Sequence, residues 1–245
     1  MTPSIKDKFN KEIRDFYRGF SNAEAFGTML FFIIVLWLAW FFTRGFPESR
    51  LLILHPRTIS SIPAIFTSNF FHLSFPHLFG NLLFFVPLGF LVLKFEGLRG
   101  MLGILTGMLI GGFVVWWFGT EGTVYGGFSR AVMACWGILF VWVIRQSLPL
   151  TVGFLILSYF FMEFSLFETI RPTAHTASNN ISWLGHLGGL IGGMAYQVRS
   201  LAIALEMLYK ADKVSEEEFM AISVRIHDNK SAQTEDEILD VEKPE

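Results

Sequence analysis

The stretch "SWLGHLGGLIGGMAY", from Ser182 to Tyr196, combines an apolar run with regularly spaced glycines. Glycine occurs there at every fourth position in two overlapping series: Gly185, Gly189, Gly193, and Gly188, Gly192. Residues four apart lie on the same face of a helix. Each series therefore forms a smooth strip on which a neighbouring backbone can approach closely. The stretch predicts a membrane helix in tight contact with other helices.

The composition of the whole chain is that of a membrane protein. Of its 245 residues, 52% are hydrophobic and 16% are charged, well below the usual share of about 25%. Six apolar runs approach the roughly 17 to 25 residues that span a bilayer: 25–42, 78–93, 101–118, 131–144 with 128–130 added, 150–167 and 183–205. We predict an all-α polytopic membrane protein with a six-transmembrane-helix bundle over residues 25–205.

The two ends of the chain differ from this membrane domain. Residues 1–24 alternate apolar and basic side chains at helical spacing, which predicts a cytoplasmic amphipathic helix on the inner membrane surface. A soluble helix docked on the domain fits the same pattern. Ser21 and Glu24 have the spacing of a capping box at the start of the first span. Residues 206–245 form an acidic cytoplasmic tail that we expect to be partly disordered.

The distribution of Lys and Arg predicts the orientation in the membrane. The richer side holds Lys94, Arg99, Arg145 and the basic residues of both termini, and the poorer side holds Arg44, Arg50, Arg57 and Arg171. Positive charge gathers on the cytoplasmic side. We therefore expect a multi-pass protein, in the plasma membrane, with both termini cytoplasmic. The first apolar run begins too late for a cleavable signal peptide, and the net charge of −2 gives no sign of nucleic-acid binding.

Polar side chains within the spans are the first candidates for a functional site, because they are costly in lipid. His77 and Asn81 lie one turn apart at the start of the second span, Ser129 at the start of the fourth, and His186 near the start of the sixth. These three spans all enter from the outer side, so the side chains reach similar depths. The sequence therefore predicts a hydroxyl, an imidazole and an amide in one layer of the outer leaflet.

Small residues in the fourth span would let this site close. Ala131, Ala134 and Gly137 face the glycine strip that contains Gly185, and close packing would bring His186 within hydrogen-bond reach of Ser129. An adjacent imidazole is the usual activator of a serine nucleophile. The alternatives are that Ser129 caps its helix and that His77 and Asn81 only join helices.

Other chemistry is less well supported by these residues. His72, His77, His175 and His186 could bind zinc, but the sequence has no HExxH helix, and we expect no metal and no cofactor. His72 fits a structural role and a cavity-lining role equally well. The single cysteine, Cys135, excludes an internal disulfide and fits a packing role.

The motifs His77-x-x-x-Asn81, Gly127-Phe128-Ser129 and Gly185-His186 with Gly189 and Gly193 resemble the signature of rhomboid intramembrane serine proteases. The resemblance covers residues 25–205. It implies hydrolysis of single-span membrane proteins near the outer membrane face, with helix 150–167 as a lateral gate. A non-catalytic rhomboid-like protein that binds or escorts transmembrane clients is the alternative.

The same resemblance implies a role for each residue of the site. Ser129 would be the nucleophile, and His186 the general base and then the general acid. The oxyanion hole would consist of Asn81, His77 and the Ser129 N–H, and Gly127 and Phe128 would contact substrate. Because every aspartate lies in the termini, the catalytic pair is a dyad, with Glu121 and Glu168 as the carboxylates that could orient His186.

Arg130 departs from the family pattern, in which glycine usually follows the serine. The loop after the first span also has Pro63-Ala64 in place of the usual Trp-Arg pair, and Met133 stands where a tyrosine is common. A long cationic side chain at a membrane-helix end can extend toward water. We expect Arg130 to point outward past Glu121 or to lipid phosphates, away from the dyad, and to anchor the short outer loop.

Overall fold

The computed structural model describes residues 18–45, 52–72, 74–165 and 183–213, together with Lys11, Asp15 and Phe16. Within these residues the secondary structure is helical apart from one isolated antiparallel bridge between Leu54 and Tyr125, which confirms the all-α prediction. The helices are α2 (Asn22–Gly45), η1 (Ile59–Ser61), α3 (Ala64–Thr67), η2 (Ser68–Phe70), α4 (Phe75–Phe118), α5 (Ser129–Ile144), α6 (Leu148–Ser165) and α8 (Trp183–Lys213).

The chain divides into two compact units. Tyr17–Ser200 form the larger unit, and Met1–Phe16 with Leu201–Glu245 form the other. The larger unit contains all the helices above except the last part of α8. Most of the predicted N-terminal amphipathic helix and all of the acidic tail beyond Lys213 lie outside the described residues.

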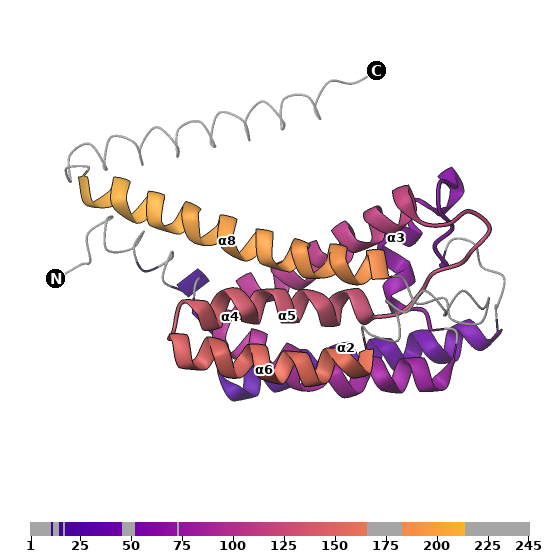
Figure 1. The fold of residues 1–245 in the computed structure, drawn as a ribbon, viewed down its shortest axis with the longest axis horizontal. Helices are drawn as coiled ribbons and strands as arrows, with labels where there is room; N and C mark the ends of the chain where they lie inside the picture. The colour runs from indigo at the N-terminus through magenta and orange to yellow at the C-terminus, as the bar shows by residue number, and fades with distance from the viewer. Residues whose placement is uncertain are drawn as a thin grey trace, which may run out of the picture. The chain divides into compact units, whose positions relative to one another are not determined.

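Helix α4 consists of two helices that meet at Gly97. Gly97 has φ 52° and ψ −132°, a conformation that side chains with a Cβ rarely adopt, and a Cβ there would collide with the Arg18 carbonyl oxygen. We call residues 75–96 the first arm and residues 98–118 the second arm. They correspond to the predicted spans 78–93 and 101–118, and α5 packs against α4 (Figure 1).

Two of the described helical segments qualify as candidate membrane spans by length and composition. Asn22–Phe42 and Phe75–Phe118 are long and apolar enough to cross a bilayer, while Ser129–Ile144 and Leu148–Tyr159 are apolar but shorter. Because Gly97 interrupts the second of these segments, its two arms are separate helices.

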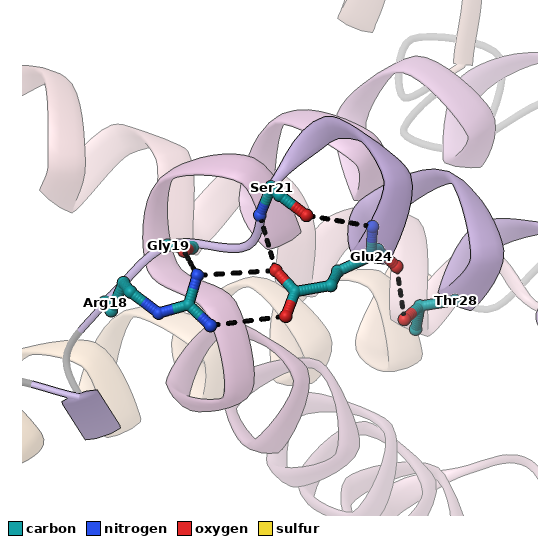
Figure 2. Close-up of polar contacts among 5 residues, drawn as sticks. All are labelled: Arg18, Gly19, Ser21, Glu24 and Thr28. Atoms are coloured by element: carbon teal, nitrogen blue, oxygen red, sulfur yellow. Dashed lines mark hydrogen bonds and ion pairs between the residues drawn. The ribbon is translucent and has the colours of Figure 1, made fainter. Parts of the chain in front are cut away.

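The start of α2 is held by the predicted capping box, which the structure confirms. The Ser21 N–H donates to Glu24 Oε2 at 2.7 Å, and the Glu24 N–H donates to Ser21 Oγ at 3.2 Å (Figure 2). Arg18 donates to both carboxylate oxygens of Glu24, at 3.2 and 3.4 Å. The adjacent Phe20 N–H donates to the Leu93 carbonyl oxygen at 2.9 Å. The entry to α2 is therefore attached to the end of the first arm of α4.

The glycine series of α8 contact two different helices. A Cβ at Gly189 or Gly193 would lie 2.5 Å from the carbonyl oxygen of Arg130 or Ala134 in α5. The predicted packing of these two spans is confirmed. The second series faces the second arm of α4, which the sequence did not predict: a Cβ at Gly188 would lie 2.8 Å from Gly111 Cα, and one at Gly192 would lie 2.9 Å from Gly107 Cα.

A buried ionic cluster lies beside the Gly97 break. Glu96 is 1% exposed and forms ion pairs with Arg99 and, at 3.4 Å, with Arg145 at the end of α5. The sequence had placed Arg99 among the surface charges of the cytoplasmic side, but its side chain is buried. Its charge is balanced by Glu96 rather than by lipid headgroups, because a buried charge is tolerated only when it is paired.

The loop between α2 and α4, which we call the outer loop after its predicted side of the membrane, buries several polar side chains and exposes several apolar ones. Ser61, Ser68 and Asn69 are fully buried, whereas Ile59 is 79% exposed and Ile62 is 47% exposed. The same loop also buries Leu54 and Ala64 and exposes Arg57 and Ser60, so both kinds of side chain occur on both sides.

The glycine contacts of α8 lead to a stability prediction. Gly193→Ala places a methyl group against the Ala134 backbone, so we expect a loss of about 1 to 3 kcal/mol from overpacking. Gly27→Ala in α2 is the matched control, since a Cβ there meets nothing within 4 Å, and it should be neutral or slightly stabilising because alanine favours helix. Thermal unfolding in detergent measures both. Equal midpoints for the two variants would contradict close packing of α8.

Candidate active site

The first arm of α4 starts beside the loop that precedes α5. Ser74 caps the helix by accepting the His77 N–H at 3.3 Å. Its first turns then present the His77 ring and the Asn81 amide to Gly127: a Cβ at Gly127 would lie 2.7 Å from His77 Nε2 and 3.4 Å from Asn81 Nδ2. Gly127 has φ 126°, so both its conformation and its surroundings require glycine.

The structure assigns His72 a defined role that sequence reasoning left open. Its Nε2 lies 3.2 Å from the Phe128 backbone nitrogen and 2.9 Å from Asn81 Nδ2. Because a backbone N–H can only donate, this ring nitrogen is the acceptor, and Asn81 donates to it as well. One N–H of Asn81 is thereby used, and the other is available to a further acceptor.

The side chain of Phe128 belongs to the core. It is fully buried, with its ring 4.6 Å from that of Phe85 in an edge-to-face arrangement and close to Phe32 and Phe70. The prediction that Phe128 contacts substrate can therefore hold only for its backbone. This anchored ring places Ser129 at the first position of α5, where its N–H has no acceptor within the helix.

Ser129 and His186 lie at the starts of two helices whose backbones touch. Gly189, one turn after His186, packs on the Arg130 backbone, which follows Ser129 directly. His186 is 4% exposed, whereas Ser129 is half-buried. No hydrogen bond joins these two described side chains. In enzymes without substrate such pairs are often longer than in the reacting complex.

The surroundings of His186 contain no carboxylate partner within the part of the chain that the structure describes. Its Nδ1 is buried without a hydrogen-bond partner, and the charged neighbours that act on the ring are Arg130 and His77. Glu121 pairs instead with Arg57, with Nε and Oε1 2.5 Å apart at the surface. Glu168 lies outside the described residues.

Arg130 does not extend to the membrane surface, so that prediction was wrong. It is 4% exposed, and its guanidinium donates from Nε to Asn69 Oδ1 at 2.9 Å and from Nη2 to Ser68 Oγ at 2.7 Å. The side chain does not extend outward past Glu121, because its two hydrogen-bond acceptors lie inside the fold. Its side chain binds the loop between α2 and α4 from beneath, instead of anchoring the short loop before Ser129 from outside.

Ser68 and Asn69 are the residues that sequence reasoning missed. Both are fully buried, and the Ser68 carbonyl oxygen also accepts the Gly127 N–H at 2.9 Å. Their signal in the sequence is a polar pair between Phe66 and Phe70 in an apolar loop. The sequence did not indicate the hydrogen-bond partners of this pair, because those partners lie more than fifty positions away in the chain.

Two further predictions concern residues outside this arrangement. Cys135 is buried in α5 within the hydrophobic core, as its packing role requires. Among the described residues no group of three or more His, Cys, Asp or Glu side chains could hold a metal ion. His175, one of the four histidines considered for zinc, is not among them.

The fold and the arrangement of these residues define a polytopic helical membrane protein with a polar site at the starts of α4, α5 and α8. The Rhomboid domain family model matches residues 56–202, more than half of the chain. The chain therefore belongs to the rhomboid family, whose members are typically intramembrane serine proteases that act on transmembrane substrates. No curated protein matches the chain.

The buried position of His72 leads to a prediction about pH. Burial, with the nearby His77 charge as a smaller cause, lowers the pKa of His72 from 6.5 to about 3. The unfolded chain then binds more protons than the folded one between these values, so the stability that neutral His72 contributes is complete above pH 6.5 and is lost as the pH falls toward 3.

His72→Gln removes this titration and keeps an oxygen that can accept the Phe128 N–H. Between about pH 6 and pH 4, we expect the free energy of unfolding of the wild type to fall by up to about 1.4 kcal/mol per pH unit more than that of the variant. Denaturant unfolding in detergent across this range measures the difference. Parallel curves would show that His72 is not a buried neutral histidine.

Proposed function

We propose that this protein is a serine endopeptidase that hydrolyses peptide bonds of single-span membrane proteins near the outer membrane face. The observation that supports it most directly is the meeting of three helix starts. Gly127, two residues before Ser129, touches His77 and Asn81, and α8 packs on the residue that follows Ser129 one turn beyond His186. The family match supports the same activity.

The proposed reaction uses only groups of this chain. His186 removes the proton from Ser129 Oγ as that oxygen attacks the substrate carbonyl carbon, and the carbonyl oxygen becomes an oxyanion. The Ser129 N–H, the second N–H of Asn81 and His77 are the donors for this oxyanion. His186 then gives its proton to the leaving amine. Water, deprotonated by His186, hydrolyses the acyl-enzyme and restores Ser129.

The proposal includes six membrane crossings with both termini cytoplasmic. The interruption of α4 at Gly97 supports the count, because it separates two apolar arms. In this topology the starts of α4, α5 and α8 face the outer side. The two exposed isoleucines of the outer loop, Ile59 and Ile62, support a position of the site near lipid.

We propose α6 as the lateral gate for substrate. Its Phe154 packs on Trp136 and Phe140 of α5, with ring centroids 5.0 and 6.5 Å apart. Most of its other described side chains are exposed, including Ile156 and Tyr159. A helix that is attached mainly along one side can move outward with little loss of packing.

A non-catalytic rhomboid-like protein that binds transmembrane clients is the second candidate. The absence of a hydrogen bond between Ser129 and His186, both of which the structure describes, and the buried charge of Arg130 beside them favour it. A fluorophosphonate or isocoumarin probe separates the two. It labels an activated serine and leaves a client-binding protein unlabelled.

The proposed dyad predicts that Ser129→Ala and His186→Ala each abolish cleavage of a transmembrane substrate by detergent-purified protein. We expect a loss on the order of 10⁴-fold or more in kcat, and a double variant that is no worse, because the two groups act as a unit. Thr106→Ala is the matched control, since it removes a half-buried hydroxyl of the second arm of α4 that donates to the Leu102 carbonyl oxygen of its own helix. Substantial cleavage by Ser129→Ala would refute the assignment.

The oxyanion hole predicts a separation of kcat from KM. Asn81→Ala should lower kcat by about 10² to 10³-fold while KM changes by less than about threefold, because the donor acts mainly on the transition state. His77→Ala should act in the same direction. Steady-state kinetics on one substrate give both constants. An unchanged kcat in both variants would remove these residues from the oxyanion hole.

A further inference from the structure

The Arg130 side chain contacts several different elements around the site. Its stem lies between two glycines: a Cβ at Gly111 would be 3.1 Å from Arg130 Cδ, and one at Gly185 would be 3.4 Å from Arg130 Cγ. Its guanidinium bonds Ser68 and Asn69 of η2. The side chain therefore joins α5 to the second arm of α4, to α8 and to the outer loop.

The guanidinium is buried without an ion pair to any of the described carboxylates. Its partners among the described residues are neutral, a hydroxyl and an amide oxygen. A buried cation is costly unless its donors are used. The two acceptors come from consecutive residues and bind two nitrogens of the planar guanidinium. A lysine ammonium lacks this fixed geometry.

The outer loop, to which the Arg130 guanidinium binds, also contacts residues of the site. Asn69 Nδ2 donates to the carbonyl oxygens of Phe66, at 2.7 Å, and Ile65, at 3.3 Å. The Ser68 carbonyl oxygen accepts the Gly127 N–H at 2.9 Å. The contacts form a closed ring from Arg130 through Ser68 to Gly127, and back along the chain through Ser129.

We propose that Arg130 is a positioning residue for Ser129 and His186. Its stem sets the distance between the start of α5 and Gly185, the residue before His186, and its guanidinium keeps Gly127 against His77 and Asn81 through the outer loop. The proposal rests on the proposed function, because it assigns Arg130 a part in that reaction. Arg130 touches neither the substrate nor the reacting atoms in this assignment.

The test compares Arg130→Met with Arg130→Lys. Methionine keeps an unbranched stem and loses the donors, whereas lysine keeps the charge and loses the paired geometry. We expect kcat to fall by about 10²-fold in Arg130→Met, as for a misplaced catalytic group, with KM within about threefold. Lysine should recover less than half of this loss on a logarithmic scale. Arg57→Met is the matched control, because Arg57 holds the same loop through an exposed ion pair to Glu121.

A second variant keeps the test informative if Arg130→Met does not fold. Ser68→Ala combined with Asn69→Ala removes the two acceptors and leaves Arg130 in place. Its kcat should fall by a similar factor, and adding Arg130→Met should cause little further loss, because coupled residues are not additive. Losses that multiply independently would overturn the proposal. So would a kcat within twofold of wild type in Arg130→Met, even if its melting temperature is lower.

Hydrogen exchange separates a failure of this proposal from a failure of the proposed function. We expect the amides of residues 125–129 to exchange faster in Arg130→Met than in wild type or Arg57→Met, whether or not the protein cleaves substrate. Unchanged exchange at these amides would overturn the positioning role. If the wild type cleaves no substrate and takes up no serine probe, the proposed function fails, while faster exchange would still support Arg130 as the residue that holds the loop.

Discussion

The close approach of α8 to two other helices is the constraint on which the rest of the fold depends. Lipid is as apolar as the helix surfaces, so helices in a membrane associate through packing rather than through the hydrophobic effect. Gly188 and Gly192 admit the second arm of α4, and Gly189 and Gly193 admit α5. A larger side chain in either strip would separate helices that must touch for Ser129 and His186 to lie near each other.

At the helix starts, hydrogen bonds add to the packing that the glycines allow along the helices. His72, Ser68 and Asn69 accept hydrogen bonds from Phe128, Gly127 and Arg130, which surround Ser129 in the sequence. In a low-dielectric environment such bonds are strong, and leaving one unmade is costly. The loop before the fourth predicted span is therefore held at successive residues by partners from the outer loop.

In the proposed reaction, His186 acts without a carboxylate partner among the described residues. His186 lies in the first turn of α8, its Nδ1 is buried without a hydrogen-bond partner, and the charged groups that act on its ring are Arg130 and His77. Membership of the rhomboid family and this geometry lead to the same proposed chemistry from independent observations.

The sequence alone was sufficient for features that depend on neighbours in the chain. Helix positions, the Ser21–Glu24 capping box and the glycine strip facing α5 follow from local spacing, and the structure bears them out. The burial of Arg130 and of Arg99, and the role of His72, were decided by the tertiary structure. Their partners are distant in the sequence or hidden by the packing. A charged or titratable side chain takes its state from the groups that surround it in space, and periodicity does not specify those groups.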